Sequence, residues 1–230
     1  MARGLGRALE KAIARKEDAA TPAARESLFM HPQRREMFRL LCLRPCATAG
    51  ELARQSGLSA NAVRWHLQRL ALANLVVRDP RAAYFFPKGF IDPGDGPLFR
   101  VLAEGGTRDV FRAVLETQGA TQREIAEGLG VSRQAVFKSA GLLEAHKLLT
   151  SIEDGRFRRY YPTGFLFQRR EANRSRAKGF ADGLVKQLES SGLTPHVLRR
   201  TDRQLLVRIA HGKAAESLDL SLDPYTTVLQ

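Results

Sequence analysis

The sequence predicts a mainly helical protein with small β elements: two copies of one module in tandem, followed by a small α+β domain. Three observations predict this architecture. One segment of the first half recurs 73 residues later, each copy ends in two short strand-like runs, and the last third changes from one long helix to alternating strands. With 230 residues, of which 43% are hydrophobic, the chain can bury several small cores.

The internal repeat is the basis for the domain division. Residues 49–59 align with residues 122–132, and the aromatic-Pro-x-Gly-Phe stretch at 86–90 matches the one at 161–165 with a shift of 75 residues. The second copy therefore carries two extra residues ahead of this stretch. We expect one module over residues 31–92 and the other over 93–165.

The first module reads as three helices and two strands. Apolar residues recur at helical spacing over 37–41, a second short helix must end at Gly57, and Ser59 is placed to cap a third helix. Strand-like residues follow at 75–77 and 83–86. The apolar stripe of the third helix is Val63, Leu67 and Leu70.

The second module repeats this order. We expect helices near 107–117, 121–128 and 132–145, the last capped by Ser132, and a hairpin around Asp154-Gly155. The acidic loop 92–97 reads as a linker between the modules. The hairpin strands are expected near 148–153 and 156–161. Three helices followed by a β-hairpin make a winged helix.

The third helices carry a family resemblance. Residues 58–70, LSANAVRWHLQRL, resemble the turn and recognition helix of ArsR/MarR-type winged helix-turn-helix regulators, and residues 131–138, VSRQAVFK, are similar to the second and third helices of the same superfamily. The paired modules, over about residues 32–165, resemble tandem winged-helix transcriptional regulators common in archaea. The resemblance implies sequence-specific binding of double-stranded DNA and a role in transcription regulation.

The candidate DNA-binding residues lie on the third helices and the hairpins, or wings. A recognition helix enters the major groove, where Asn and Gln suit adenine and Arg suits guanine, while wing arginines and helix N-termini suit phosphates. In the first module the candidates are Ser59, Ala60, Asn61, Arg64, Trp65, Gln68, Arg78 and Arg81. In the second module they are Ser132, Arg133, Gln134, Phe137, Lys138, Arg156, Arg158 and Arg159.

The charge of the chain favours a polyanionic partner. Lys and Arg number 37 against 24 Asp and Glu, which gives a net charge of +13 and a sequence pI of about 10.5. Residues 31–97 carry +5 of this charge, so we expect the first module to lead in DNA binding. No apolar run is long enough to cross a membrane and no secretory signal opens the sequence, so we expect a cytoplasmic, nucleoid-associated protein without a membrane partner.

Metal, cofactor and catalytic sites are not expected. The two cysteines, Cys42 and Cys46, lack two further ligands nearby, and the histidines fall in no metal-ligand spacing. No Ser-His-Asp, paired-carboxylate or phosphate-loop pattern appears, so we expect no enzyme. Redox sensing through the two thiols remains an open alternative.

Two other functions stay open at this point. A sequence-tolerant chromatin or architectural protein would also be basic, and winged helices also serve as protein-interaction scaffolds in chromosome maintenance. The second module is the better candidate for a protein contact, because Phe137 stands where Arg64 stands in the first module. Trp65 suits either stacking on a sugar or covering the helix–wing junction.

The two ends of the chain carry less specific signals. Residues 1–30 read as an amphipathic helix with a linker, and residues 166–192 as a long connecting helix, interrupted near Gly179 or Gly183, whose basic early part could touch DNA or join protomers. Residues 193–230 read as a β-rich domain of three or four strands, the last at 225–229. This domain could dimerise, bind an effector or contact another protein, and the sequence does not choose among these. A homodimer through the long helix or this domain is thus one open alternative, and the sequence names no effector.

Overall fold

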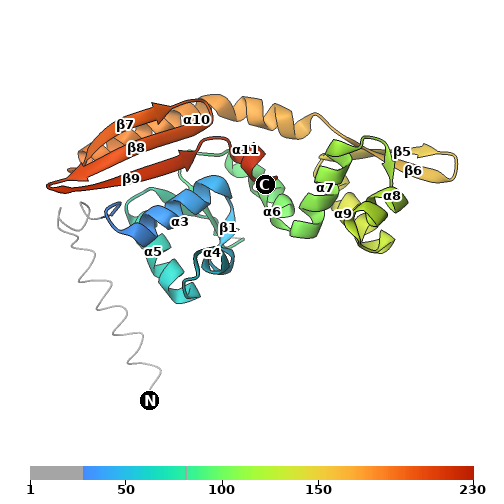
Figure 1. Cartoon of the computed structure of the whole chain (residues 1–230), viewed down its shortest axis with the longest axis horizontal. Helices are drawn as coiled ribbons and strands as arrows, with labels where there is room; N and C mark the ends of the chain where they lie inside the picture. The colour runs from blue at the N-terminus through green and yellow to red at the C-terminus, as the bar shows by residue number, and fades with distance from the viewer. Residues whose placement is uncertain (1–27, 81) are drawn as a thin grey trace, which may run out of the picture.

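The computed structural model describes residues 28–80 and 82–230 (Figure 1). The expected N-terminal amphipathic helix falls outside the described residues, as does Arg81. Within them the two repeated modules and the final β-rich region are all present.

The first module is a winged helix. Its small sheet has the order β1-β3-β2, with both neighbouring pairs antiparallel and Val77 opposite Phe86 in the wing. Its elements are α3 (Pro32–Leu43), β1 (Ala47–Thr48), α4 (Ala49–Ser56), α5 (Ala60–Leu72), β2 (Val76–Arg78) and β3 (Tyr84–Pro87).

The second module repeats this order and topology, with a sheet in the order β4-β6-β5. Its wing strands pair over six residues each, against three pairs in the first wing. The sequence-predicted helices and hairpin are confirmed to within two residues. The elements are α7 (Gly105–Glu116), β4 (Ala120–Thr121), α8 (Gln122–Leu129), α9 (Arg133–Ala145), β5 (Leu149–Asp154) and β6 (Phe157–Pro162).

The same local signals start and stop the helices of both modules. In α4 the Thr48 hydroxyl accepts from the Glu51 amide while the Glu51 carboxylate accepts from the Thr48 amide, and α8 has the same capping box. Gly57 and Gly130 end these helices in the left-handed region, at φ 71° and 64°. The repeat is therefore encoded in the caps as well as in the apolar positions.

The acidic segment 92–97 between the modules is mostly a tight turn, and a helix that the sequence did not predict follows it. A short 3₁₀ turn, η1 (Pro93–Asp95), leads into α6 (Gly96–Ala103). Leu98, Phe99 and Leu102 lie on one face of α6 and are buried, which makes this helix part of the core. The Asp-Pro-Gly sequence does form a turn, but the turn ends at Asp95 and α6 begins at Gly96.

One continuous helix, α10 (Phe165–Ser190), follows the second module, so the expected interruption near Gly179 or Gly183 is wrong. Phe180, Ala181 and Leu184 are buried around these glycines. Packing on this face offsets the low helix propensity of glycine, which amounts to about 1 kcal/mol per residue.

The C-terminal region is an antiparallel three-stranded sheet in the order β7-β8-β9. Its strands are β7 (Thr194–Arg200), β8 (Gln204–His211) and β9 (Ala214–Ser221). The expected strand at 225–229 is wrong, because Pro224 begins a short helix, α11 (Pro224–Thr227), whose Tyr225 and the following Val228 are buried.

The C-terminal sheet shares one core with the first module. Strand β9 lies along α3, and Arg35 of α3 pairs with Glu216 of β9 at 2.7 Å. Phe180 of α10 packs against Phe38 and Phe90, with ring centroids 6.2 and 4.7 Å away. Figure 1 shows α10 running from the second module to the sheet, which covers the first module.

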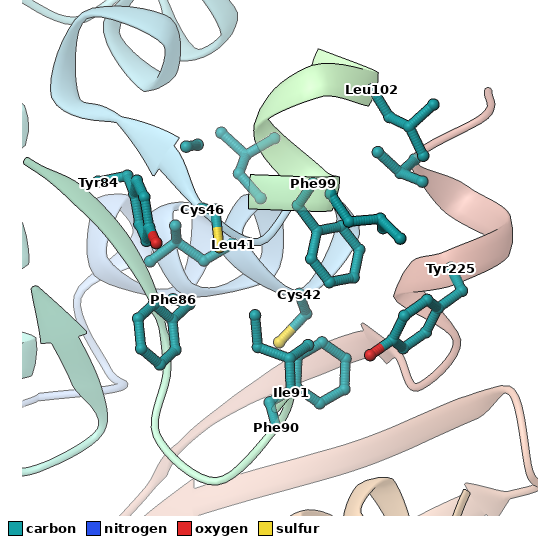
Figure 2. Packing of buried hydrophobic residues seen from close by; sticks show 14 of the residues in the cluster. Leu41, Cys42, Cys46, Tyr84, Phe86, Phe90, Ile91, Phe99, Leu102 and Tyr225 are labelled. Atoms are coloured by element: carbon teal, nitrogen blue, oxygen red, sulfur yellow. The ribbon is translucent and has the colours of Figure 1, made fainter. Parts of the chain in front are cut away.

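The C-terminal helix closes this core (Figure 2). Tyr225 of α11 packs on Phe99 of α6 with centroids 4.9 Å apart, beside the fully buried Cys42. Burial raises the pKa of both thiols, that of Cys46 to about 12, so neither is a reactive thiolate near neutral pH. This burial argues against redox sensing.

Candidate nucleic-acid interface

Helix α5 separates a buried face from an exposed one. Ser59 caps it by accepting from the Ala62 amide at 3.2 Å, and Val63, Leu67 and Leu70 are fully buried. Of the candidate residues on this helix, Ala60 is half-buried, whereas the others are exposed. The exposed residues are Asn61, Arg64, Trp65 and Gln68.

Asn61 and Arg64 form a polar pair on the outer face of α5. The Arg64 guanidinium donates to the Asn61 side-chain oxygen at 2.9 Å, one helical turn away. Within the described residues no carboxylate pairs with this guanidinium. A solvent-exposed hydrogen bond of this kind is easily exchanged for one to a base edge.

Trp65 is held between two arginines. The guanidinium carbons of Arg34 and Arg69 lie 5.3 and 5.5 Å from its ring centroid, and the ring meets His66 edge-on at 4.8 Å. Trp65 nevertheless stays 41% exposed. The exposed part of the ring is therefore accessible to a partner.

Arg34 is a cation that the sequence analysis missed. It lies near the start of α3 and is itself buried, and its Nε makes no hydrogen bond with any residue that the structure describes. Only the tertiary packing of α3 against α5 brings it to Trp65. The position of Arg69 four residues after Trp65 on the same helix was a usable signal for the other half of the pair.

Two histidines that contact each other lie next to Trp65. His31 and His66 have ring centroids 5.0 Å apart, and the Nε2 of His66 donates to the Gln33 side-chain oxygen at 2.8 Å. Burial, and secondarily the neighbouring cations, hold the pKa of both imidazoles below the ordinary value. Both rings are therefore neutral near pH 7, as expected of packing histidines.

Helix α9 exposes a broader and less polar face than α5. Ser132 caps it by accepting from the Ala135 amide at 3.1 Å, and all five candidate residues here are exposed. Phe137 is 55% exposed and so contributes little to the core. The exposed candidates are Ser132, Arg133, Gln134, Phe137 and Lys138.

The arginines of the second wing divide into two kinds. Arg158 pairs with Glu144 at 3.1 Å and donates to Ser151, and Arg159 pairs with Asp154 at 2.6 Å. Arg156 makes no ion pair with any described residue and only stacks on Phe157, at 5.0 Å. Arg156 is thus the wing cation most available to a phosphate; in the first wing Arg78 is exposed.

The first arginines of α10 form ion pairs within the molecule. Arg169 pairs with Asp95 at 2.7 Å and Asp92 at 3.2 Å, and Arg170 pairs with Asp223 at 2.6 Å. These contacts tie α10 to the segment between the modules and to the C-terminal helix. The expectation that this basic stretch touches DNA therefore does not hold for Arg169 and Arg170, which form ion pairs within the molecule.

The two recognition helices share one side of the molecule. In Figure 1 both α5 and α9 lie toward the lower edge, away from α10 and the C-terminal sheet. The C-terminal sheet and α10 cover neither of these two helices in this view.

Two further kinds of site were sought in the part of the chain that the structure describes. No three His, Cys, Asp or Glu side chains there gather in a way that could hold a metal ion. No helix in that part has the length and apolar character needed to span a membrane.

Fold and exposed helices together define a tandem winged helix-turn-helix protein of the ArsR/MarR-like type. The helix-turn-helix domain family matches residues 29–79, and the MarR family matches residues 108–159. These are domains of DNA-binding transcription regulators, and the chain carries one of each in tandem. The resemblance of both modules is confirmed, whereas its archaeal character stays a prediction.

Comparison with complete proteins adds little. No curated protein matches the chain. Among solved structures, the DIP2311 protein from Corynebacterium diphtheriae is 16% identical with a TM-score of 0.24, covering 61% of this chain and 26% of that one. T. acidophilum IdeR is 10% identical with a TM-score of 0.22, covering 84% and 93%. The chain thus spans about a quarter of the length of the first.

Proposed function

We propose that this protein is a transcription regulator that binds double-stranded DNA sequence-specifically, with α5 reading base edges in the major groove. The observation that carries the proposal is the outer face of α5, where Asn61, Arg64 and Gln68 are exposed above a fully buried inner stripe. Each can form a bidentate contact with a base, worth about 1–3 kcal/mol of discrimination. The remaining cations then fix the position of the helix on the backbone.

The second module supports the first on the same duplex. Arg133, Gln134 and Lys138 are exposed on α9, and α9 shares a side of the molecule with α5. Arg78 and Arg156 are the wing cations proposed to contact phosphates. The other proposed contacts are Ser59, Ala60, Trp65, Arg81, Ser132, Phe137, Arg158 and Arg159.

One observation favours a different role for the second module. Phe137 is 55% exposed in the middle of its recognition helix. An apolar ring there suits a thymine methyl group or a protein surface. A protein-interaction scaffold is therefore the second candidate function, and a sequence-tolerant architectural protein remains the alternative within DNA binding.

We also propose that the protein acts as a homodimer in the cytoplasm, at the nucleoid. The edge strand β7 exposes Val197 and Leu198, which gives the C-terminal sheet an apolar rim. Light scattering coupled to size-exclusion chromatography tests this directly, with monomer at micromolar concentration contradicting it.

The test is DNA binding by single-site variants. A preferred duplex is selected from a randomised library with the wild-type protein, and binding to it and to a scrambled duplex is measured by fluorescence anisotropy. Arg64→Ala should weaken specific binding by about tenfold or more while changing scrambled binding little. Arg112→Ala, at an exposed position of α7 outside both helix-wing surfaces, is the matched control.

The same assay separates the alternatives. Failure of the library to yield any preferred sequence, together with tight duplex binding, indicates an architectural protein. Weakening by Arg133→Ala as well assigns part of the binding to the second module. Absence of duplex binding at low salt would remove the proposal.

A further inference from the structure

Helix α9 carries an apolar ring where the equivalent helix of the first module carries a cation. Under the 73-residue shift of the repeat, Phe137 corresponds to Arg64. The Phe137 side chain is 55% exposed, whereas Val136 and Ala140 on the inner side of α9 are buried. The core of the module therefore does not use this ring, and a partner that covers it would gain the free energy of burying an aromatic side chain.

A glycine lies one helical turn after this ring. Gly141 is exposed in the interior of α9 and corresponds to Gln68 of the first module. A Cβ added to Gly141 would meet nothing within 4 Å, so packing inside the protein does not require glycine here, although glycine weakens a helix interior. Residues four apart lie about 5–6 Å from each other on one helix face. The missing side chain therefore leaves room directly beside the Phe137 ring.

The groups around the ring indicate an anionic partner. Arg133 and Lys138 are exposed on α9, and neither forms an ion pair with any residue that the structure describes. Gln134, three residues before Phe137, is exposed as well, and its amide can bond to the N6 and N7 atoms of adenine. The exposed face of α9 thus suits a partner that combines negative charge, amide-like hydrogen-bonding groups and a small apolar group.

The major groove of DNA offers this combination at A·T pairs. Thymine projects its C5-methyl group into the groove, and the adenine of the same pair presents N6 and N7 there. The phosphates on either side of the groove suit Arg133 and Lys138. An acidic protein surface supplies the charge, but it gives no reason for a glutamine amide and a ring at this spacing. DNA therefore accounts for more of the exposed groups of α9.

We infer that the second module recognises thymine, with Phe137 packing on its C5-methyl group. Gly141 lets α9 lie close to the floor of the groove, and Gln134 bonds to an adenine of the same A·T step. Recognition of thymine rests on the proposed function, since it requires α9 to enter the major groove. It adds which base the second module reads and by which chemistry.

The two modules then read different features of one duplex. Helix α5 reads base edges through the hydrogen bonds of Asn61, Arg64 and Gln68, whereas α9 reads a methyl group. Because two unlike surfaces are joined in one chain, a single copy of the protein recognises two unlike half-sites and not an inverted repeat. The sequence bound by one chain is thus asymmetric, with its A·T pairs under α9.

The test removes the methyl group from the DNA and the ring from the protein separately. Each thymine of the selected duplex is replaced in turn by deoxyuridine, which lacks only the C5-methyl group, and binding is measured by fluorescence anisotropy. At one or two thymines the replacement should weaken wild-type binding by about fourfold, the factor expected for one buried methyl group. In Phe137→Ala the same replacements should have no effect, because ring and methyl group are the two sides of one contact.

Phe167→Ala is the matched control for the loss of an exposed ring. Phe167 lies on α10, outside both recognition helices, and is 53% exposed. This variant should keep the full response to deoxyuridine. Circular dichroism confirms that each variant is folded.

Gly141→Leu tests the close approach of α9 to the groove. Leucine is a good helix former and its Cβ meets no neighbour here, so the midpoint of urea unfolding should not fall. Duplex binding should nevertheless weaken by about tenfold, because the new side chain stands between α9 and the bases. Gly183→Leu on α10, where an added Cβ also meets nothing within 4 Å, should leave binding unchanged.

Three results would overturn the recognition of thymine. If no deoxyuridine replacement changes wild-type binding, no methyl group is read. A methyl effect that persists in Phe137→Ala places the contact elsewhere in the protein. If Phe137→Ala changes the mass measured by light scattering but not the binding of DNA, the ring contacts a second copy of the chain instead.

A further pair of duplexes separates this inference from the proposed function. An alternating A·T duplex and its deoxyuridine counterpart require no selected sequence. A difference between them that Phe137→Ala abolishes supports thymine recognition even if the library yields no preferred site. Specific binding that Arg64→Ala weakens, without any methyl effect, retains the proposed function and rejects thymine recognition by α9.

Discussion

Asp95 is the residue that joins three parts of the molecule. It is 4% exposed and accepts from the Nε of Arg169 at 2.7 Å and from the Tyr225 hydroxyl. Burial and the adjacent carboxylate raise the pKa of Tyr225, which keeps its hydroxyl protonated as a donor. One carboxylate thus links η1, α10 and α11.

We expect Asp95→Asn to lower the free energy of unfolding by about 1–3 kcal/mol. The amide keeps an acceptor for Tyr225 but removes the charge that pairs with the partly buried Arg169. Urea unfolding followed by circular dichroism measures the change. Glu171→Gln breaks the exposed pair with Arg174 and should change stability by less than about 0.5 kcal/mol; equal effects would contradict the role given to Asp95.

The histidine pair predicts a loss of stability in mild acid. The pKa of His31 and of His66 is lowered from 6.5, so the unfolded chain takes up these protons at a higher pH than the folded chain does. Their contribution is complete above about pH 6.5 and is lost as the pH falls toward the lowered values. Thermal unfolding between about pH 7.5 and 5.5 should show a falling midpoint.

His31→Asn provides the matched measurement, since asparagine is well suited to the N-cap position that His31 occupies on α3. The variant should show a shallower dependence on pH than the wild type. His211→Asn, at an exposed position at the end of β8, is the matched control for the removal of a histidine. Glu51 and Asp92, whose pKa values lie below their ordinary range, stay ionised throughout this window.

The exposed side of α5 was predictable from the sequence. Asn61, Arg64 and Gln68 are exposed because a stripe at i, i+4 and i+7 determines which side of a helix is buried. The same spacing does not reveal that Arg34 lies beside Trp65 or that Arg158 pairs with Glu144. Those contacts depend on which elements lie next to each other, and spacing along one helix carries no such information.

At the scale of the element, α10 is less stable than it would be with alanine at two interior positions. Gly179 and Gly183 lie in its interior, and a Cβ added at either position would meet nothing within 4 Å. Both therefore carry the entropic cost of glycine without a steric reason for it.

We expect Gly179→Ala and Gly183→Ala each to raise the free energy of unfolding by about 0.5–1 kcal/mol. Gly130→Ala should instead destabilise the protein, because Gly130 adopts φ 64° at the end of α8, a conformation that alanine rarely adopts. Urea titration of the three variants gives the comparison. No gain from either α10 substitution would mean that the helix is interrupted in solution.

Elements with strong local signals were predictable, and elements defined by burial were not. Ser59 and Ser132 fix the starts of the recognition helices, and Asp154-Gly155 fixes the second hairpin. Helices α6 and α11 follow Pro-Gly or Asp-Pro signals that equally describe a loop or turn. Their helical form depends on burying Phe99 and Tyr225 against each other, which only the tertiary structure provides.

At the scale of the whole molecule, the available cations determine how strongly DNA binding depends on salt. If both modules neutralise about 6–10 phosphates, affinity should fall by about 10³–10⁵ between 50 and 200 mM salt. Arg156→Ala should reduce the slope of log affinity against log salt by about one. Arg170→Ala, which removes an internal ion pair, should leave the slope unchanged, and a wild-type slope near zero would contradict the phosphate contacts.

The sharing of one core by the first module and the C-terminal region has a consequence for synthesis. Thr227 donates to the carbonyl oxygen of Leu43 across 184 residues of chain. On the ribosome, the surface that α11 covers must therefore stay open while the second module, α10 and the C-terminal sheet are still being made. Long-range closure of this kind slows folding, so the first winged-helix module, although it is translated first, is among the last parts to be completed.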